Sequence, residues 1–452
     1  MFDFIKDFSP WVLFSDAGII FLLLLLGKLC RAKVKAVQSL FIPPSLIAGI
    51  LALAFGPNGL GWIPLSNNLG TYSAILIAVV FAALPLNSPS FKIKEVAGKV
   101  GPMWAFSQFG MLAQWAVMGL LGILLFTPIW GVKEPFGIML AVGFYGGHGT
   151  AAAMGDTFGQ MGWPDALSLG MTTATVGVVL GVIGGIIFIK LATKKHQTSY
   201  VTDFAELPSE LRSGLLPSEK RDSVNTATTS SISIESLTLH LGFVFVAAFC
   251  GFLLSRGVKI LNPNLDIPVF LSAYLLGLLF KLIYDKTGVS RYMDKPTIGS
   301  ISGTATDLLV ACGVGAINLK VVAANWVPLV VLILAGTALT IFIVFYFARH
   351  LYSSDWFEKA IFAWGWWTGT MAIGIALLRI VDPKNESHAL DNYALAFLPC
   401  APVEIILILS VPIAYQGGWL LWLCAGYLLL AILIMLLARK LGWWIKKPAS
   451  RS

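Results

Sequence analysis

The chain has 452 residues, of which 57% are hydrophobic and 12% are charged, and its formal net charge is +8. Soluble domains average about 25% charged residues, so this chain has too few charges to cover a surface that faces water. The basic residues form no long block with interleaved aromatic residues, which argues against nucleic acid as a partner. The apolar residues gather instead into runs near the ~20 that a helix needs to cross a bilayer. The sequence therefore predicts an all-α polytopic membrane protein.

Eleven apolar segments are predicted to span the membrane. In chain order they are residues 12–30, 41–58, 70–88, 101–127, 165–190, 236–255, 267–283, 296–318, 325–348, 392–415 and 418–440. Two further stretches, 136–160 and 357–382, are rich in Gly and Thr and are interrupted by polar residues, so we predict re-entrant hairpins there. The one clearly polar segment, 196–234, is predicted to be a partly disordered cytoplasmic linker.

The distribution of Lys and Arg predicts the orientation. If the N-terminus lies outside, the cytoplasmic loops hold most of the basic residues, beginning with Lys28, Arg31, Lys33 and Lys35, and the outer loops keep few. Because cytoplasmic loops carry an excess of Lys and Arg, we predict an external N-terminus and a cytoplasmic C-terminus. The membrane is predicted to be the bacterial inner (plasma) membrane.

The two halves of the chain show the same order of elements. Residues 42–53 read IPPSLIAGILAL and residues 267–278 read IPVFLSAYLLGL, so in both a Pro follows Ile at the start of a span. Each half contains five spans and one hairpin, an odd number of crossings, so the second copy must enter the membrane from the opposite side. We predict two inverted-topology repeats, 1–195 and 235–415, followed by an extra span and tail in 416–452; many secondary carriers have this architecture.

The sharpest motif, GFYGGHGTAAAMGD, lies in the first hairpin. Gly is about 1 kcal/mol worse than Ala in a helix, so the run predicts a break. Backbone groups that a break frees at membrane depth must line a cavity or meet a ligand. Freed amides suit a carboxylate, whereas carbonyls and a Thr hydroxyl suit Na+; close helix packing through small residues is the alternative. The predicted substrate- and ion-binding residues are Gly146, Gly147, His148, Gly149 and Thr150.

The counterpart in the second half is the hairpin 357–382. Thr368, Gly369 and Thr370 are predicted to form its tip and to contribute to the binding site. Arg379 lies in the descending limb, where its planar fork suits a carboxylate on the substrate. The alternative is that Arg379 lies near the cytoplasmic interface and extends to lipid headgroups.

Two acidic residues, Asp307 and Glu404, fall inside predicted spans. A carboxylate at membrane depth usually faces the bundle interior and marks an ion or proton pathway. We predict that Asp307 binds the coupling cation, whereas Glu404 either binds directly or forms an ion pair with Arg379. The predicted sodium ligands are Asp307, Thr304, Thr306 and Thr150.

Together these features resemble the bacterial sodium/glutamate symporters of the glutamate:sodium symporter (ESS) family. The resemblance rests on IPPSLIAG in the second span, PLN at the end of the third, GGHGTAAA in the first hairpin and ATVGVVLG (174–181) in the helix after it. It implies Na+-driven uptake of glutamate, hairpin tips that meet near the midplane, and a homodimer with an elevator mechanism, in which a transport domain moves beside a static scaffold. The three tryptophans of WGWWTGTMAIG and Asp307 depart from the family pattern, which leaves the substrate open.

Two other functions stay open at this point. One is a proton-coupled or exchange carrier for another carboxylate, with Asp307 and His148 as titrating groups; the other is a channel. The sequence contains no GxxxxGK[ST], HExxH or GxSxG motif, so ATP-driven transport and enzymatic catalysis are unsupported. We expect no cofactor apart from Na+ as the coupling ion.

Overall fold

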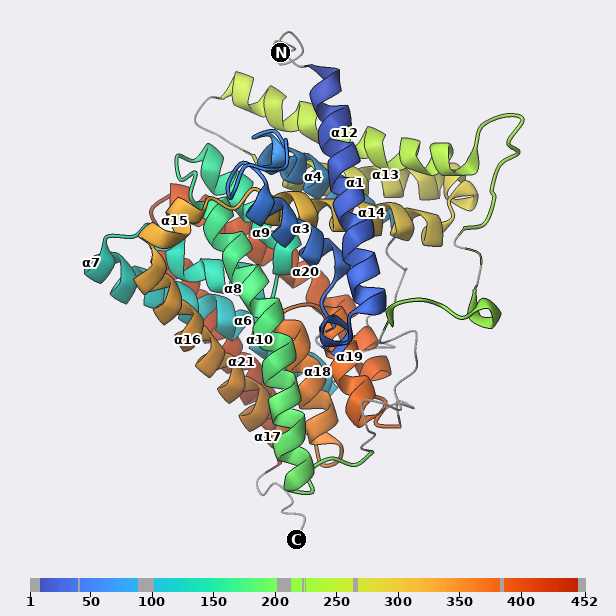
Figure 1. Cartoon of the computed structure of the whole chain (residues 1–452). Helices are drawn as coiled ribbons and strands as arrows, with labels where there is room; N and C mark the ends of the chain where they lie inside the picture. Colours follow the sequence, from blue (N-terminus) through green and yellow to red (C-terminus); the bar gives the residue numbers. More distant parts are fainter. Residues whose placement is uncertain are drawn as a thin grey trace. The chain divides into compact units, whose positions relative to one another are not determined.

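The computed structural model describes residues 9–39, 41–87, 101–200, 213–221, 223, 225–262, 267–382 and 386–445. Within these residues the chain is helical and contains no strand, as predicted (Figure 1). The first half contains α1 (Pro10–Lys33), α2 (Lys35–Ser39), α3 (Pro44–Phe55), α4 (Leu69–Asn87), α6 (Gly101–Leu121), α7 (Thr127–Trp130), α8 (Ile138–Phe144), α9 (Gly147–Gln160) and α10 (Ala166–Lys194). The second half contains α12 (Ser236–Leu261), α13 (Val269–Thr287), α14 (Lys295–Gly315), α15 (Leu319–Ala324), α16 (Trp326–Phe342), α17 (Ala348–Leu351), α18 (Trp356–Thr368), α19 (Met371–Val381), α20 (Ala389–Gln416) and α21 (Leu420–Lys440).

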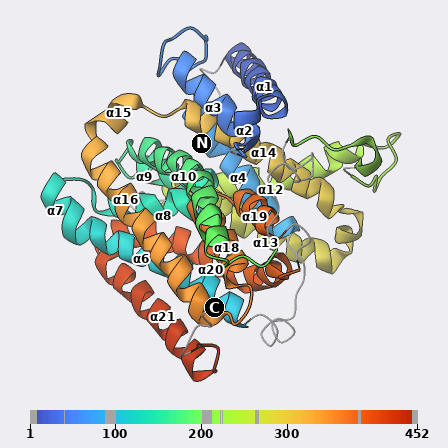
Figure 2. The ribbon, with the colours of Figure 1, turned by 60° about the horizontal axis from the view of Figure 1, so that its bottom comes forward.

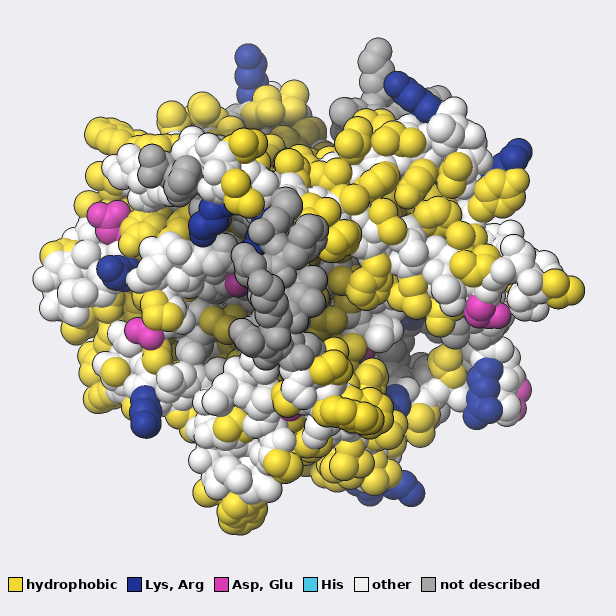
Figure 3. Space-filling model, turned by 90° about the horizontal axis from the view of Figure 1, so that it is seen from above, with side chains coloured by type: hydrophobic (Ala, Val, Ile, Leu, Met, Phe, Trp, Pro, Cys, Tyr) yellow, Lys and Arg dark blue, Asp and Glu magenta, His cyan; other side chains and the backbone are white. Residues whose placement is uncertain are grey.

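Among the described residues, nine helices are long and apolar enough to cross a membrane, so the chain is a multi-pass membrane protein. Its surface fits this conclusion, since hydrophobic side chains cover much of the face seen in Figure 3 and charged groups are scattered there. Two of the eleven predicted spans are not among the nine. The helix in 41–58 has only 12 residues, and the one in 267–283 carries Lys281, Asp285 and Lys286 near its end. The count of eleven therefore stays a prediction.

The helix in the fourth predicted span of each half contains the same irregularity. A π-helical turn, Gly122–Phe126, joins α6 to α7, and a second one, Ile343–Phe347, joins α16 to α17. Each half then continues with two shorter helices and one long helix. The order of elements thus agrees with a repeat, whereas the inverted orientation of the second copy and the membrane-dipping hairpins stay predictions.

By its internal contacts the chain divides into two units that each combine parts of both halves. Unit 1 consists of residues 1–28, 44–90 and 216–316, and unit 2 consists of residues 29–43, 91–215 and 317–452. In unit 1, α4 packs beside α12, α13 and α14 (Figure 1). Small residues allow the close approach: a Cβ added at Gly277 would lie 2.6 Å from the carbonyl oxygen of Ala82.

A buried carboxylate joins α1 to α4 in unit 1. Asp16 is 2% exposed. It accepts hydrogen bonds from the backbone N–H and hydroxyl of Ser66 and from the hydroxyl of Tyr72 at 2.8 Å. Since three donors satisfy this charge, Asp16 can lie inside an apolar helix. Asp16 is a third acid within a predicted span, in 12–30, besides Asp307 and Glu404, and it was not predicted to have a role.

The N-terminus of α14 is fixed by Asp294. Its carboxylate accepts from the backbone N–H of Thr297 at 3.0 Å, as an N-cap residue does. Its own N–H donates to Nε2 of His240 at 2.7 Å, and Nδ1 of that buried ring is 2.7 Å from the carbonyl oxygen of Ser236. The imidazole is therefore neutral, with its proton on Nδ1, and it ties the start of α12 to the start of α14.

Candidate functional site

The first Gly-rich segment is broken where the sequence predicts a tip. α8 ends at Phe144 and α9 begins at Gly147, with Tyr145 and Gly146 between them. Gly147 has a φ of +64°, in the left-handed region that residues with a side chain rarely adopt. A glycine at this position therefore allows the chain to turn sharply between the two helices.

α8 runs in the same direction as α10. Near the start of α8, the hydroxyl of Thr173 donates to the carbonyl oxygen of Met139 at 2.7 Å. At its end, the ring of Phe144 lies against Gly177, one turn further along α10. The two helices are thus parallel neighbours.

α9 returns along the same helix in the opposite direction. His148 forms a hydrogen bond of 3.2 Å between Nε2 and the Oγ1 of Thr175. Later in α9, Gly155 packs on Leu167, nearer the start of α10. Residues 136–160 therefore fold back on themselves as a helical hairpin and do not form one unbroken helix.

The second Gly-rich segment is also a helical hairpin. α18 and α19 are separated by Gly369 and Thr370. The side chain of Thr370 accepts from the N–H of Ile373 at 3.3 Å and so caps α19. A Cβ added at Gly365 would lie 2.7 Å from the backbone nitrogen of Gly374, so the two limbs pack backbone to backbone. The predicted tip is thus located where the sequence placed it.

The two tips lie next to each other in unit 2. A Cβ added at Gly147 would be 3.4 Å from the carbonyl oxygen of Gly369. The second tip also rests on α10, because a Cβ at Gly177 would lie 2.1 Å from the carbonyl oxygen of Thr368. Figure 2 shows α10 beside α8, α9 and α18. α10 is therefore a shared wall against which both hairpins pack.

Two helices begin at this junction. The first N–H groups of α9, from Gly147 onward, have no acceptor within their own helix, and the same holds for α19 except where Thr370 caps it. The N-terminus of a helix carries a partial positive charge, so an anion is stabilised beside it. His148 and Thr150, both 5% exposed, belong to the first turn of α9. The junction thus offers backbone donors, an imidazole and a hydroxyl to a carboxylate.

The three tryptophans of the second hairpin pack on α10, on the first tip and on α6. Nε1 of Trp364 donates to the carbonyl oxygen of Gly181 at 2.8 Å, which fixes α18 to α10. The ring of Trp366 packs on Tyr145 at the first tip, with 4.7 Å between ring centroids. Trp367 packs on α6. Trp366 and Trp367 thus bring aromatic rings to Tyr145 at the first tip.

The family of the chain follows from comparison with known proteins. The model of the sodium/glutamate symporter family matches residues 14–372, which contain both tips and α10. The chain belongs to the sodium/glutamate symporter family. This confirms the resemblance predicted from the sequence and makes the chain a member of a family of sodium-coupled transporters. Comparison with curated proteins finds no match.

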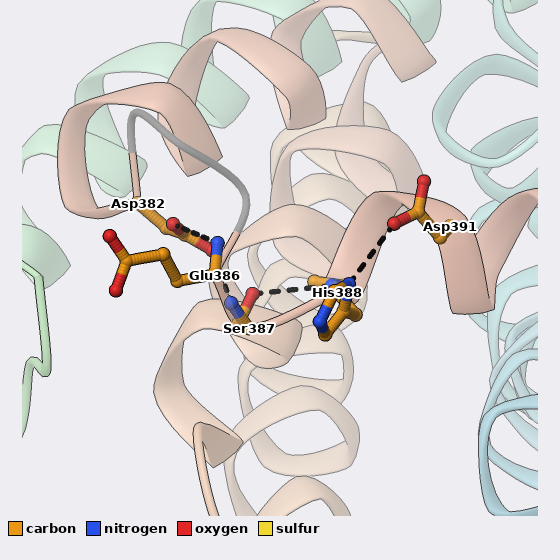
Figure 4. Close-up of polar contacts among 6 residues, drawn as sticks. Asp382, Glu386, Ser387, His388 and Asp391 are labelled. Atoms are coloured by element: carbon orange, nitrogen blue, oxygen red, sulfur yellow. Dashed lines mark hydrogen bonds and ion pairs between the residues drawn. The ribbon is translucent and has the colours of Figure 1, made fainter.

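Arg379 and the end of the second hairpin lie outside the residues that the symporter family model matches. Arg379 is in the last turn of α19 and is half-buried. At 1.5 Å per residue, it lies about 13 Å along the helix from Thr370. Asp382 directly follows α19, and its buried carboxylate accepts from the backbone N–H groups of Glu386 and Ser387 at 2.8 and 2.9 Å (Figure 4). Arg379 is thus at the opposite end of α19 from the tip.

The predicted sodium ligands of this symporter family member do not all belong to one unit. Asp307, Thr304 and Thr306 are on α14 in unit 1, whereas Thr150 is in unit 2. Asp307 and Thr304 are exposed and share one helix face, three residues apart, whereas Thr306 directly precedes Asp307 and points elsewhere. The hydroxyls of Thr304 and Thr306 donate to the carbonyl oxygens of Ser300 and Ser302. No group of three His, Cys, Asp or Glu that could hold a metal ion occurs among the described residues.

Proposed function

We propose that this chain takes up glutamate, or a closely similar anionic amino acid or carboxylate, together with Na+ and by alternating access. The family supports coupling to sodium. The observation that carries the proposal is the contact between the two tips, where Gly147 meets Gly369 and where α9 and α19 both begin. Two positive helix ends at one junction favour an anionic group, and Na+ compensates the charge that the substrate brings to membrane depth.

The substrate is proposed to bind with one carboxylate at the N–H groups of α9 and α19. His148 would donate or accept a hydrogen bond there while Thr175 holds its ring. Thr150 and Thr370 would add hydroxyl oxygens beside the tips. Unit 2 contains all of these groups, so it is proposed to be the part that carries the substrate. The homodimer and the elevator mechanism remain predictions of the sequence.

Uptake by reconstituted protein tests the proposal. Proteoliposomes should accumulate labelled glutamate when a Na+ gradient is directed inward, and they should lose this accumulation when K+ replaces Na+. Since coupling is reciprocal, Na+ should tighten glutamate binding and glutamate should tighten Na+ binding. Uptake driven equally well by a pH gradient without Na+ would favour the proton-coupled carrier. A linear, non-saturable flux would favour a channel.

The orientation is proposed from the basic loops, with the N-terminus outside and the C-terminus in the cytoplasm of a bacterial plasma membrane. A reporter enzyme that works only in the cytoplasm should be active when fused after Ser452. Activity of a periplasmic reporter at the same position would reverse the orientation.

A further inference from the structure

α6 presents one polar side chain to the second tip. Phe106, Gly110 and Gln114 follow one another at spacings of four residues, which places them on one side of the helix. Trp367 of α18 packs on this side: its ring centroid is 4.8 Å from that of Phe106, and a Cβ added at Gly110 would lie 2.3 Å from the ring. One turn further along α6, Nε2 of Gln114 donates to the carbonyl oxygen of Trp367 at 3.3 Å. The amide of Gln114 therefore lies beside the residue that directly precedes the tip.

Two hydrogen bonds fix the orientation of this amide. Besides the bond to Trp367, Nε2 of Gln114 donates to the hydroxyl oxygen of Thr340 on α16 at 2.9 Å. That hydroxyl donates its own proton to the carbonyl oxygen of Gly336 at 2.8 Å, and a carbonyl oxygen can only accept. Both partners of Gln114 are thus acceptors, so the amide nitrogen must face them. The amide oxygen, Oε1, is the atom that remains for another partner.

Oε1 of Gln114 is a buried acceptor that no protein group satisfies. Gln114 is 2% exposed, and its Oε1 finds no hydrogen-bond partner among the described residues. Buried polar groups are nearly always paired, so this oxygen indicates a ligand that donates a hydrogen bond. Gln114 was not among the predicted site residues, although an amide inside the predicted span 101–127 is an unusual polar group for such a segment.

The C-terminal ends of two helices lie at the same junction. α8 ends at Phe144 and α18 ends at Thr368, directly before the points at which α9 and α19 begin. The last carbonyl oxygens of a helix have no donor within it, and they carry a partial negative charge. The junction thus offers donors to a carboxylate from two helix N-termini, and it offers acceptors to a cationic group from two C-termini and Gln114. A zwitterion matches both sets, whereas a dicarboxylate matches the donors alone.

We propose that Oε1 of Gln114 accepts a hydrogen bond from the ammonium group of an amino-acid substrate, and that it makes the carrier select glutamate over dicarboxylates of the same length. This inference rests on the proposed function and narrows its substrate class from carboxylates to amino acids. An ammonium group donates hydrogen bonds and accepts none, so it pairs with an amide oxygen and with the carbonyls of a helix C-terminus. A dicarboxylate in the same position would leave Oε1 unpaired, and a site built to bind an N–H group rejects an analogue that lacks it.

Isothermal titration of purified full-length protein with glutamate and with glutarate, in saturating Na+, tests the inference. Glutarate has the same carbon chain and both carboxylates but no amino group. The wild type should bind glutamate more tightly by at least about tenfold, because a hydrogen bond to a charged group contributes about that factor. Q114M keeps an unbranched side chain of similar length and removes the oxygen. It should weaken glutamate binding by about tenfold or more and change glutarate binding by less than about threefold.

T340V is the matched control. It removes one acceptor of the Gln114 amide but leaves the bond to the carbonyl oxygen of Trp367, so Oε1 keeps its orientation. T340V should therefore lower the melting temperature and keep the preference for glutamate over glutarate. A loss of that preference in T340V as large as in Q114M would show that the contact between α6 and α16 sets it, and the inference would be wrong.

The other outcomes separate the inference from the function on which it rests. If the wild type binds neither ligand in Na+, the proposed function fails and the inference fails with it. If the wild type binds both equally well, or if Q114M keeps the wild-type preference, the function stands and the role of Gln114 is wrong. In the second case, a higher half-saturating Na+ concentration in Q114M would assign Oε1 to the coupling ion. If Q114M does not fold, Q114E decides: an anionic oxygen there should attract the ammonium group and raise the preference for glutamate, and an unchanged or lower preference would contradict the inference.

Discussion

Replacement of Gly147 by alanine tests whether the first tip must adopt its left-handed turn to bind substrate. Space does not prevent the change, since the nearest atom to an added Cβ is the Gly369 carbonyl oxygen at 3.4 Å, an ordinary contact. The backbone does oppose it, because φ is +64°. A residue with a side chain pays about 1–2 kcal/mol there. This corresponds to a population of the binding conformation that is lower by about 5- to 30-fold.

Glutamate affinity should fall by the same factor, because an apparent dissociation constant scales inversely with the fraction of competent protein. Isothermal titration of G147A with glutamate in saturating Na+ measures it. Gly162 provides the matched control, since it also has positive φ, +86°, but has open space and lies after α9. G162A should lower the melting temperature and leave the affinity unchanged. Wild-type affinity in G147A, or an equal loss in G162A, would refute the role of the tip.

Three further predictions concern stability. Gly177→Ala places a Cβ 2.1 Å from a backbone oxygen of α18, so it should lower the free energy of unfolding by about 1–3 kcal/mol or more in denaturant titrations. Gly426→Ala is the control, because no atom lies within 4 Å of its added Cβ, and it should not destabilise the protein. Asp16→Ala leaves the donors of Ser66 and Tyr72 unpaired and should cost about 2–4 kcal/mol by the same measurement, whereas retained stability would show that water replaces the carboxylate. The side-chain hydrogen bond from Thr297 lowers the pKa of Asp294. The ionised carboxylate of Asp294 therefore stabilises α14 fully above the unfolded pKa of about 3.9. This stabilisation disappears as the pH falls through the lower pKa of the folded state. The difference in melting temperature between wild type and D294N should therefore shrink as the pH falls below about 3.9. A difference that does not change with pH would contradict the capping role.

The parts of the site that depend on local sequence were predictable. A run of glycines with His and Thr inside apolar sequence breaks a helix wherever it lies, so both tips were located to within a residue or two. The position of Thr370 as a cap follows from the same local chemistry. Long apolar runs likewise predict long helices, and nine of the eleven were confirmed within the described residues.

Other features depend on contacts between distant segments, which periodicity does not reveal. Asp16 accepts hydrogen bonds from a serine and a tyrosine about fifty residues later in the chain, and no local sequence pattern predicts these hydrogen bonds. The division into units is similar: three helices from each half form unit 1, although the linker suggests a split between the halves.

The contacts of α10 explain why the two most specific motifs of the sequence occur together. The block 146–150 forms the first tip, and the block 174–181 forms the stretch of α10 on which the second tip rests. Gly177 and Gly181 are small because the backbone of Thr368 and its hydroxyl occupy the space that their side chains would need. A bulky residue at either position would separate the tips, even though neither glycine needs to touch a substrate. The second motif is therefore a packing requirement of the site, and larger residues there should weaken glutamate and Na+ binding together.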